Sequence, residues 1–310
     1  MTVRFYFAIG AAFRQADLAI ALACGQRHFL VPAGTLAAER LRAVPDIHVM
    51  LDSQAYPPKN PRRISLAAYW RAVLGWRRAL GDWGALDCFA AYDTIGDLTQ
   101  TARDGRALQH LIDRDAPDAP LMPVAGYGMP IGTAVQAILA HPAPAVGQPS
   151  YGVGGLAVAR YSAAAEAWYS ALIDALDAAD DAQLDGVRLH LFGIGKPSWV
   201  LRSTRGLVGS FDSSGPARLA GVKGWRGIAR RYTPIYGVSV EKLQLSREAR
   251  LYYHLASYRR SVGLPWNCLD EAQFVDDRTP PLGIQQALDL DTMAYSSYAA
   301  MPSASALPQP

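Results

Sequence analysis

The sequence predicts an α/β protein built as a (β/α)8 TIM barrel, and three observations indicate this fold. Short apolar runs rich in strand-forming residues recur between residues 4 and 214, and segments with apolar residues at helical spacing lie between them. Apolar runs that alternate with helices are typical of a parallel sheet covered on both faces. Eight such runs are present and no GxGxxG motif follows the first, so a closed barrel is favoured over an open dinucleotide-binding sheet.

Each expected strand is an apolar run of strand length, and most of them close on Gly, Asp or Ser. In order they are RFYFAIG (4–10), HFLVPAG (28–34), HVMLDS (48–53), CFAAYD (88–93), LMPVAGYG (121–128), YGVGGLAV (151–158), RLHLFGIG (188–195) and GSFDSS (209–214). The segments with helical spacing between them are FRQADLAIALACG, TLAAERLRAV, SLAAYWRAVLGWRRAL, LTQTARDGRALQHLIDR, TAVQAILA and YSAAAEAWYSALIDALDAA. Only the link over 197–206 is short.

The chain has 310 residues, half of them hydrophobic, which is enough for one large domain with a well-buried core. We expect residues 1–240 to form the barrel and residues 241–298 to form helices packed on its outside. The last segment, 299–310, reads as a disordered tail.

The distribution of charge indicates what kind of molecule the protein binds. The formal net charge is only +3, which does not by itself indicate nucleic acid. Arginine-rich runs are more informative, and they are PRRIS (61–65), GWRRAL (75–80), KGWRGIARRY (223–232) and SYRRS (257–261). Any single run reads equally well as a solvated helix face, but four of them favour at least one surface that faces a polyanion.

The three cysteines, Cys24, Cys88 and Cys268, are far apart and form no CxxC pair, so we expect neither a disulfide framework nor a zinc site. The six histidines show no ligand spacing, and no function is assigned to them: His28, His48, His110, His141, His190 and His254. We find no signal peptide and no apolar run of membrane length, and we expect a cytoplasmic protein without membrane contact.

The ends of the expected strands carry the candidate site. Barrel enzymes place their chemistry at the carboxyl ends of the strands, and here those ends hold Asp52, Asp93 and Asp212. Each aspartate alone could cap the next helix. Three of them at one mouth predict a site, because carboxylates that close apolar strands are costly to bury unless they are paired or used.

Four motifs at these ends occur in the same order as in a known family. LDSQAY (51–56), YDTIGD (92–97), GGLAVAR (154–160) and FDSSGPAR (211–218) resemble the DSGG(F/Y), FDE, GGLAVGE and FD…PTR loops of the tRNA-guanine transglycosylases. These are (β/α)8 barrel enzymes that exchange guanine for a 7-deazaguanine in nucleic acid. RLHLFGIG also resembles the strand before that family's nucleophile, and the resemblance covers roughly residues 45 to 220.

The sequence departs from the tRNA enzymes at several points. Thr94 stands where the FDE loop has Glu, AGYG (125–128) stands where a QGG loop recognises the base, and the CxCxxC zinc motif is missing. This reduced pattern, with SGPAR in place of PTR, is more similar to the DNA-acting 7-deazaguanine (DpdA-like) transglycosylases.

The resemblance implies a role for each motif. Asp212 would be the nucleophile at C1′ and Asp52 the proton-transfer group. Asp93 would recognise the guanine edge, Tyr56 would stack on the flipped base, and Arg218 would pair with a phosphate. Apart from the resemblance, the basic run KGWRGIARRY, with Lys223 and Arg226, could hold phosphates or stack a base, and it reads equally well as a core tryptophan with surface arginines. The other residues expected at the base are Ser53, Gly126, Gly154, Gly155, Leu156 and Ala157. No metal and no cofactor would be needed, since a free 7-deazaguanine base is the co-substrate.

The implied function is therefore a transferase that exchanges guanine in DNA for a preQ0-like base, with helper proteins as possible partners. Three alternatives stay open: the same chemistry on tRNA, a non-catalytic nucleic-acid-binding subunit of such an enzyme, and an unrelated barrel such as a glycoside hydrolase that uses Asp52 and Asp212.

Overall fold

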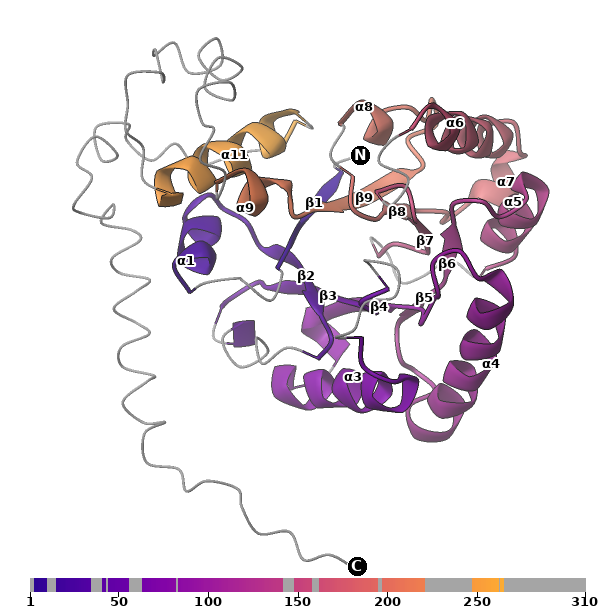
Figure 1. The fold of residues 1–310 in the computed structure, drawn as a ribbon, viewed down its shortest axis with the longest axis horizontal. Coiled ribbons are helices and arrows are strands. Elements are labelled where there is room, and N and C mark those ends of the chain that lie inside the picture. Colours follow the sequence, from indigo (N-terminus) through magenta and orange to yellow (C-terminus); the bar gives the residue numbers. More distant parts are fainter. Residues whose placement is uncertain are drawn as a thin grey trace, which may run out of the picture.

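The centre of the molecule is a ring of parallel strands with the helices outside it (Figure 1). The computed structural model describes residues 3–9, 15–34, 41–42, 44–55, 63–81, 83–141, 148–157, 162–194, 197–220, 247–261 and 263–264. The strands are β1 (Arg4–Ala8), β2 (His28–Pro32), β3 (His48–Asp52), β4 (Leu86–Ala90), β5 (Leu121–Met122), β6 (Val124–Gly126), β7 (Tyr151–Gly154), β8 (Leu189–Leu191) and β9 (Val208–Ser213).

The strand order, β5-β4-β3-β2-β1-β9-β8-β7-β6, begins and ends with two strands that are consecutive in the chain. All pairings are parallel, so the nine strands form a nearly closed, TIM-like barrel, and the expected α/β barrel class is confirmed at this level. The single strand expected over 121–128 is wrong in detail. Pro123 divides it into β5, which pairs with β4, and β6, which pairs with β7, because proline has no N–H to donate to a ladder.

The helices follow the strands as the alternation predicted. They are α1 (Gln15–Ala23), α3 (Leu66–Leu80), α4 (Leu98–Asp115), α5 (Ile131–Ala140), α6 (Ala163–Asp177), α7 (Asp181–Leu184), α8 (Pro197–Val200), α9 (Gly215–Ala220) and α11 (Arg247–Ser261), with a short 3₁₀ helix, η1 (Trp83–Ala85). Ser65, Asp97 and Ser162 cap α3, α4 and α6: each side chain accepts a hydrogen bond from a backbone N–H in the first turn, which has no partner within the helix. The helix expected over TLAAERLRAV lies largely outside the described residues.

Strand side chains are divided between two apolar cores. The larger core packs between strands and helices, and a smaller one fills the inside of the barrel. The inner core consists of Tyr6, Leu30, Met50, Cys88, Ala90 and Met122, with Ala8, Val124 and Phe192 against it. Gly152 faces this space, because a Cβ there would lie 2.6 Å from the Phe192 ring. The barrel is therefore packed rather than hollow.

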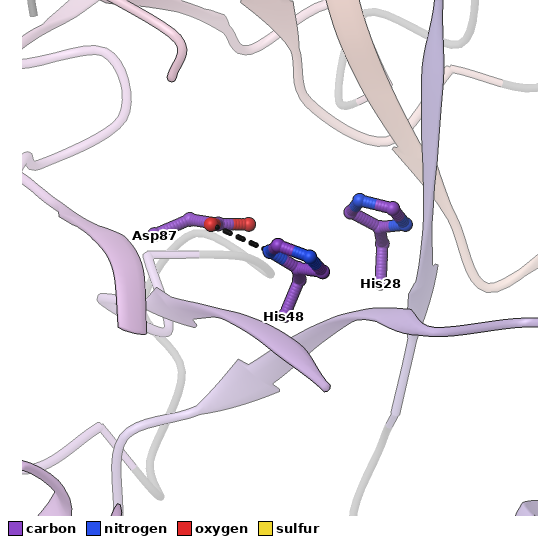
Figure 2. A group of neighbouring side chains, drawn as sticks. All are labelled: His28, His48 and Asp87. Atoms are coloured by element: carbon purple, nitrogen blue, oxygen red, sulfur yellow. Dashed lines mark hydrogen bonds and ion pairs between the residues drawn. The ribbon is translucent and has the colours of Figure 1, made fainter. Parts of the chain in front are cut away.

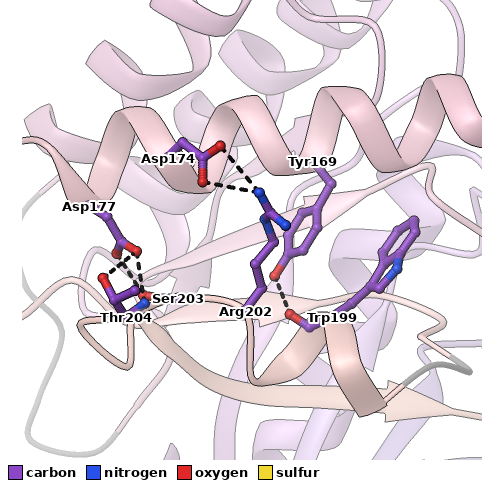
Figure 3. Close-up of polar contacts among 7 residues, drawn as sticks. All are labelled: Tyr169, Asp174, Asp177, Trp199, Arg202, Ser203 and Thr204. Atoms are coloured by element: carbon purple, nitrogen blue, oxygen red, sulfur yellow. Dashed lines mark hydrogen bonds and ion pairs between the residues drawn. The ribbon is translucent and has the colours of Figure 1, made fainter.

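The short link between β8 and β9 is fastened to helix α6 (Figure 3). The Tyr169 hydroxyl donates to the Trp199 carbonyl at 2.7 Å, and the Ser203 hydroxyl donates to Asp177 at 2.7 Å. The Thr204 amide donates to the same carboxylate at 2.8 Å. Because β9 starts at Val208, these bonds fix the entry of the strand that carries Asp212.

Helix α11 belongs to the segment expected to pack on the barrel, and it contacts α1 and α9. Leu251 and Leu255 are fully buried there, and the Arg259 guanidinium donates to Gln26 at 2.7 Å. The rest of 241–298 and the tail expected over 299–310 lie outside the described residues. The described part of the chain contains no helix long and apolar enough to cross a membrane.

An ion pair between Arg247 and Asp17 ties α11 to α1 through two N–H···O contacts. Asp17 is only 1% exposed, so the ion pair is largely desolvated and removal of its cationic member is costly. We expect Arg247→Ala to lower the free energy of unfolding by about 3–5 kcal/mol in urea denaturation. Arg202→Ala, which breaks a solvent-exposed pair with Asp174, is the control and should cost about 1 kcal/mol or less. Equal losses in the two variants would contradict the prediction.

Candidate active site

The structure brings the three strand-end aspartates together at the carboxyl ends of the strands. Asp52 is the last residue of β3, Asp212 lies near the end of β9, and Asp93 follows β4. Burial, together with the nearby charges of Asp212 and Asp93, raises the pKa of Asp52 to about 7. The three side chains therefore lie close enough to influence one another electrostatically, as carboxyl groups that share a site do.

Asp212 is held by one of its two carboxylate oxygens. Its Oδ1 accepts the backbone N–H of Gly193 at 2.9 Å and lies 3.2 Å from Nε2 of His190. Among the described residues no hydrogen bond reaches its other oxygen, Oδ2. The side chain is 5% exposed, so the carboxylate is oriented by Oδ1 while Oδ2 remains available to a reacting atom.

His190, to which the sequence analysis assigned no function, is the residue that orients Asp212. It is fully buried in β8, with Nε2 toward Asp212 and Nδ1 2.9 Å from the Ser210 hydroxyl. The signal that could have found it is register. His190 pairs with Ser210 of the neighbouring strand, and Asp212 lies two residues further along that strand, on the same face.

The loop after β3 shapes the Asp52 site. The Gln54 backbone amide hydrogen bonds to the Asp52 carboxylate and by itself lowers the pKa of that carboxyl. Gln54 has φ of 61°, a left-handed conformation that costs energy for a residue with a side chain. Burial outweighs this bond, so Asp52 holds its proton close to neutral pH.

Asp93 is fixed by neighbours on the β3 loop. The Ser53 hydroxyl donates to Asp93 Oδ1 at 2.9 Å. Burial raises the pKa of Asp93, and this hydrogen bond offsets the rise only in part. Arg63 donates to the Asp93 carbonyl and to the Thr94 hydroxyl, the latter at 3.3 Å. Its guanidinium also lies 3.9 Å from the centre of the Tyr92 ring.

Arg63 is a second residue that the sequence analysis missed as part of the site, because PRRIS was read as a surface run. Its positive charge lowers the pKa of both Asp52 and Asp93. Its Nε is buried and has no hydrogen-bond partner among the described residues. Arg63 thus acts on both carboxylates and on the loop that starts at Asp93.

A cavity of about 280 Å³ opens beside Asp93. Its lining includes Asp93, Gly126 and Gly155 of the expected base-binding set, together with Thr94, Tyr127 and Met129. Gly155 has φ of 81°, and a Cβ there would lie 3.1 Å from Cβ of Tyr127, so a side chain would strain the turn and crowd the wall. The cavity is at the small end of ligand sites and suits a small molecule that offers donors to a carboxylate.

The other expected site residues have different outcomes. Gly154 closes β7, Leu156 is fully buried, and Ala157 lies against Gly193, where an added Cβ would come within 2.9 Å. Tyr56, Lys223 and Arg226 lie outside the described residues. For Arg218 the structure gives only its place in helix α9.

Comparison of the sequence with protein-family models and with curated proteins finds no match.

Proposed function

We propose that the protein is a glycosyltransferase that exchanges guanine in DNA for a 7-deazaguanine base through a covalent aspartyl-glycosyl intermediate. The observation that carries the proposal is the pairing of two unlike carboxylates. Asp212 is oriented through Oδ1, while burial and the neighbouring charges raise the pKa of Asp52 to about 7. A fixed nucleophile beside a group that can give and take a proton is what base exchange requires.

In the first half-reaction Oδ2 of Asp212 attacks C1′ of the target nucleotide. The bond from C1′ to the guanine nitrogen breaks, its electron pair goes to the base, and the Asp52 proton neutralises the departing guanine. The hydrogen bond from the Gly193 amide to Oδ1 stays in place while the ester forms.

In the second half-reaction the ionised Asp52 removes a proton from the ring nitrogen of the incoming 7-deazaguanine. That nitrogen attacks C1′, the ester bond breaks, and Asp212 regains its charge. Contact from His190 to Oδ1 would help the carboxylate to leave, since a donor to the ionised form stabilises it. One N-glycosidic bond replaces another, so the exchange needs no energy source.

Recognition of the base falls to Asp93 and its cavity. A carboxylate accepts hydrogen bonds from guanine N1–H and from the exocyclic amine, and Ser53 and Arg63 hold it in place. The cavity walls at Gly126 and Gly155 would lie against the ring. A base inside a duplex cannot reach this mouth, so the target nucleotide has to leave the stack.

DNA is favoured over tRNA by the sequence. Cys268 is the only cysteine after Asp212, so the sequence lacks the CxCxxC zinc motif of the tRNA enzymes that it resembles. The arginine- and tryptophan-rich run at 223–232 follows the nucleophile strand in the sequence, and its composition suits contacts with phosphates and stacking on a base.

The test is a nucleoside assay by mass spectrometry. Purified protein is incubated with preQ0 and either duplex DNA, single-stranded DNA or tRNA. A 7-deazaguanine deoxynucleoside in hydrolysed DNA is the expected product. Product in tRNA alone would show that the substrate is tRNA and not DNA. Turnover of free sugars or nucleosides, with no exchange in either nucleic acid, would favour the unrelated hydrolase, and binding without exchange would favour a non-catalytic subunit.

The variant Arg63→Gln tests together the positive charge of Arg63 and its hydrogen bonds to the Asp93 carbonyl and the Thr94 hydroxyl. We expect kcat/KM for the incoming base to fall about 10–100-fold, because one or two charge-assisted hydrogen bonds to the Asp93 loop are lost. Loss of the positive charge should also shift the pH profile of activity to higher pH, since Arg63 lowers the pKa of Asp52 and of Asp93. Arg71→Gln, on the exposed face of α3, is the control. An unchanged pH profile and unchanged KM for the base in Arg63→Gln would refute this role.

A further inference from the structure

A cluster of two histidines and an aspartate lies at the opposite end of the barrel from the candidate active site. His28 and His48 are the first residues of β2 and β3 and pair in register, while Asp87 is near the start of β4. Figure 2 shows the two rings facing each other, with Asp87 bonded to His48. One nitrogen from each ring and one oxygen from the carboxylate lie within 4.8 Å of one another.

The backbone of β4 places Asp87 in this cluster. The register between β3 and β4 shifts, so that Val49 pairs with Leu86 while Met50 pairs with Cys88. Asp87 is the extra residue of this β-bulge, a device that re-aims a side chain. It is 4% exposed, and its two oxygens accept from the Tyr6 hydroxyl and contact Nδ1 of His48 at 2.9 Å.

We propose that His28, His48 and Asp87 bind a divalent transition metal ion of the zinc type, with the Tyr6 hydroxyl holding Asp87 from behind. Two imidazoles and one carboxylate are ligands that Zn²⁺ and its neighbours in the series prefer. A hydroxyl that fixes a ligating carboxylate is a common outer partner of such sites. Mg²⁺ and Ca²⁺ are disfavoured, because they need several oxygen ligands.

The geometry requires two local changes. His48 Nδ1 and Asp87 Oδ1 share a hydrogen bond of 2.9 Å, and the ion would displace its proton to solvent; the two atoms are already close to the separation of about 3.3 Å between ligands in a tetrahedron with bonds of about 2.0 Å. The His28 and His48 rings, however, are stacked with centroids 4.5 Å apart and planes 10° apart. A shared ion lies near the plane of each ring, so His28 has to turn out of the stack. Neither ring is fully buried.

The position assigns the ion a structural role. His48 and Asp52 lie at opposite ends of β3, about 13 Å apart at the usual rise per residue. The ion would join the starts of three adjacent strands at the face of a barrel that serves stability rather than catalysis. The proposal therefore stands or falls independently of the transferase chemistry.

The experiment is a Co²⁺ titration of the full-length protein after chelator treatment and gel filtration, read by visible absorption and by elemental analysis. Wild type should bind one equivalent and gain thermal stability with saturating Co²⁺ or Zn²⁺. His28→Ala and Asp87→Asn should lose about 100-fold or more in affinity, and Tyr6→Phe about 10–100-fold. His110→Ala, which removes an exposed histidine of α4, should bind as wild type does.

Two results would overturn the proposal. One is wild type that keeps no stoichiometric metal and shows no metal-dependent shift in melting temperature. The other is His28→Ala and Asp87→Asn variants that bind as tightly as wild type. The wild-type melting shift needs no variant, so the test remains decisive even where a substitution disturbs folding.

Discussion

Replacing Asp212 with asparagine should lower base exchange by about 10⁴-fold or more and abolish the covalent adduct with DNA. The amide keeps the shape of the carboxylate, and its oxygen can still accept the Gly193 N–H. It carries no negative charge and cannot form the ester with C1′. The loss should therefore appear in chemistry and not in folding. The measurements are the nucleoside assay and a denaturing gel of protein incubated with labelled DNA in the absence of the incoming base.

Asp113→Asn is the matched control, because it makes the same change on the exposed face of α4, outside the candidate site. It should exchange base at the wild-type rate. An adduct that persists in Asp212→Asn would assign the nucleophile to another residue, and Asp52 would be the next to test. Full activity in Asp212→Asn would remove the covalent mechanism altogether.

The fold followed from features that a single sequence displays. Apolar runs of strand length and their alternation with amphipathic helices depend only on local periodicity, so the barrel class could be predicted. Pro123 divides a strand whose apolar pattern is continuous, and that pattern does not predict that the two halves pair with different strands. The proline itself was the available signal.

The site could be predicted only where a strand ends in an unusual residue. Asp52 and Asp212 stand out because carboxylates close apolar runs. His190 and Arg63 do not stand out, since one is an interior strand residue and the other belongs to a basic run. Their roles depend on which strands are neighbours and in which register, and that information is non-local. The pairing of His28 with His48 is of the same kind.

The pH dependence of Asp52 supplies the second large effect. In the proposed mechanism Asp52 has to carry a proton to neutralise the departing guanine, and its pKa is about 7 because of burial and the charges of Asp212 and Asp93. We expect kcat/KM of the wild type for nucleic acid to fall as pH rises above about 7. Asp52→Asn should be about 10²–10⁴-fold less active, and it should lose this alkaline limb. An alkaline limb near pH 7 that survives in Asp52→Asn would assign it to another group.

Stability should change in the opposite direction from activity in the same variant. The pKa of Asp52 is raised in the folded protein, so its contribution to stability is complete below about pH 4, the unfolded value, and is lost as pH rises through about 7. Asparagine cannot ionise and escapes this loss. Between pH 5 and pH 8 Asp52→Asn should therefore gain about 2 kcal/mol on the wild type in urea denaturation, while Asp113→Asn should show no such trend. A carboxylate that served only the fold would lose stability when replaced. A gain in stability at neutral pH would show that the fold does not need this carboxylate, as expected of a group kept for the proposed proton transfer.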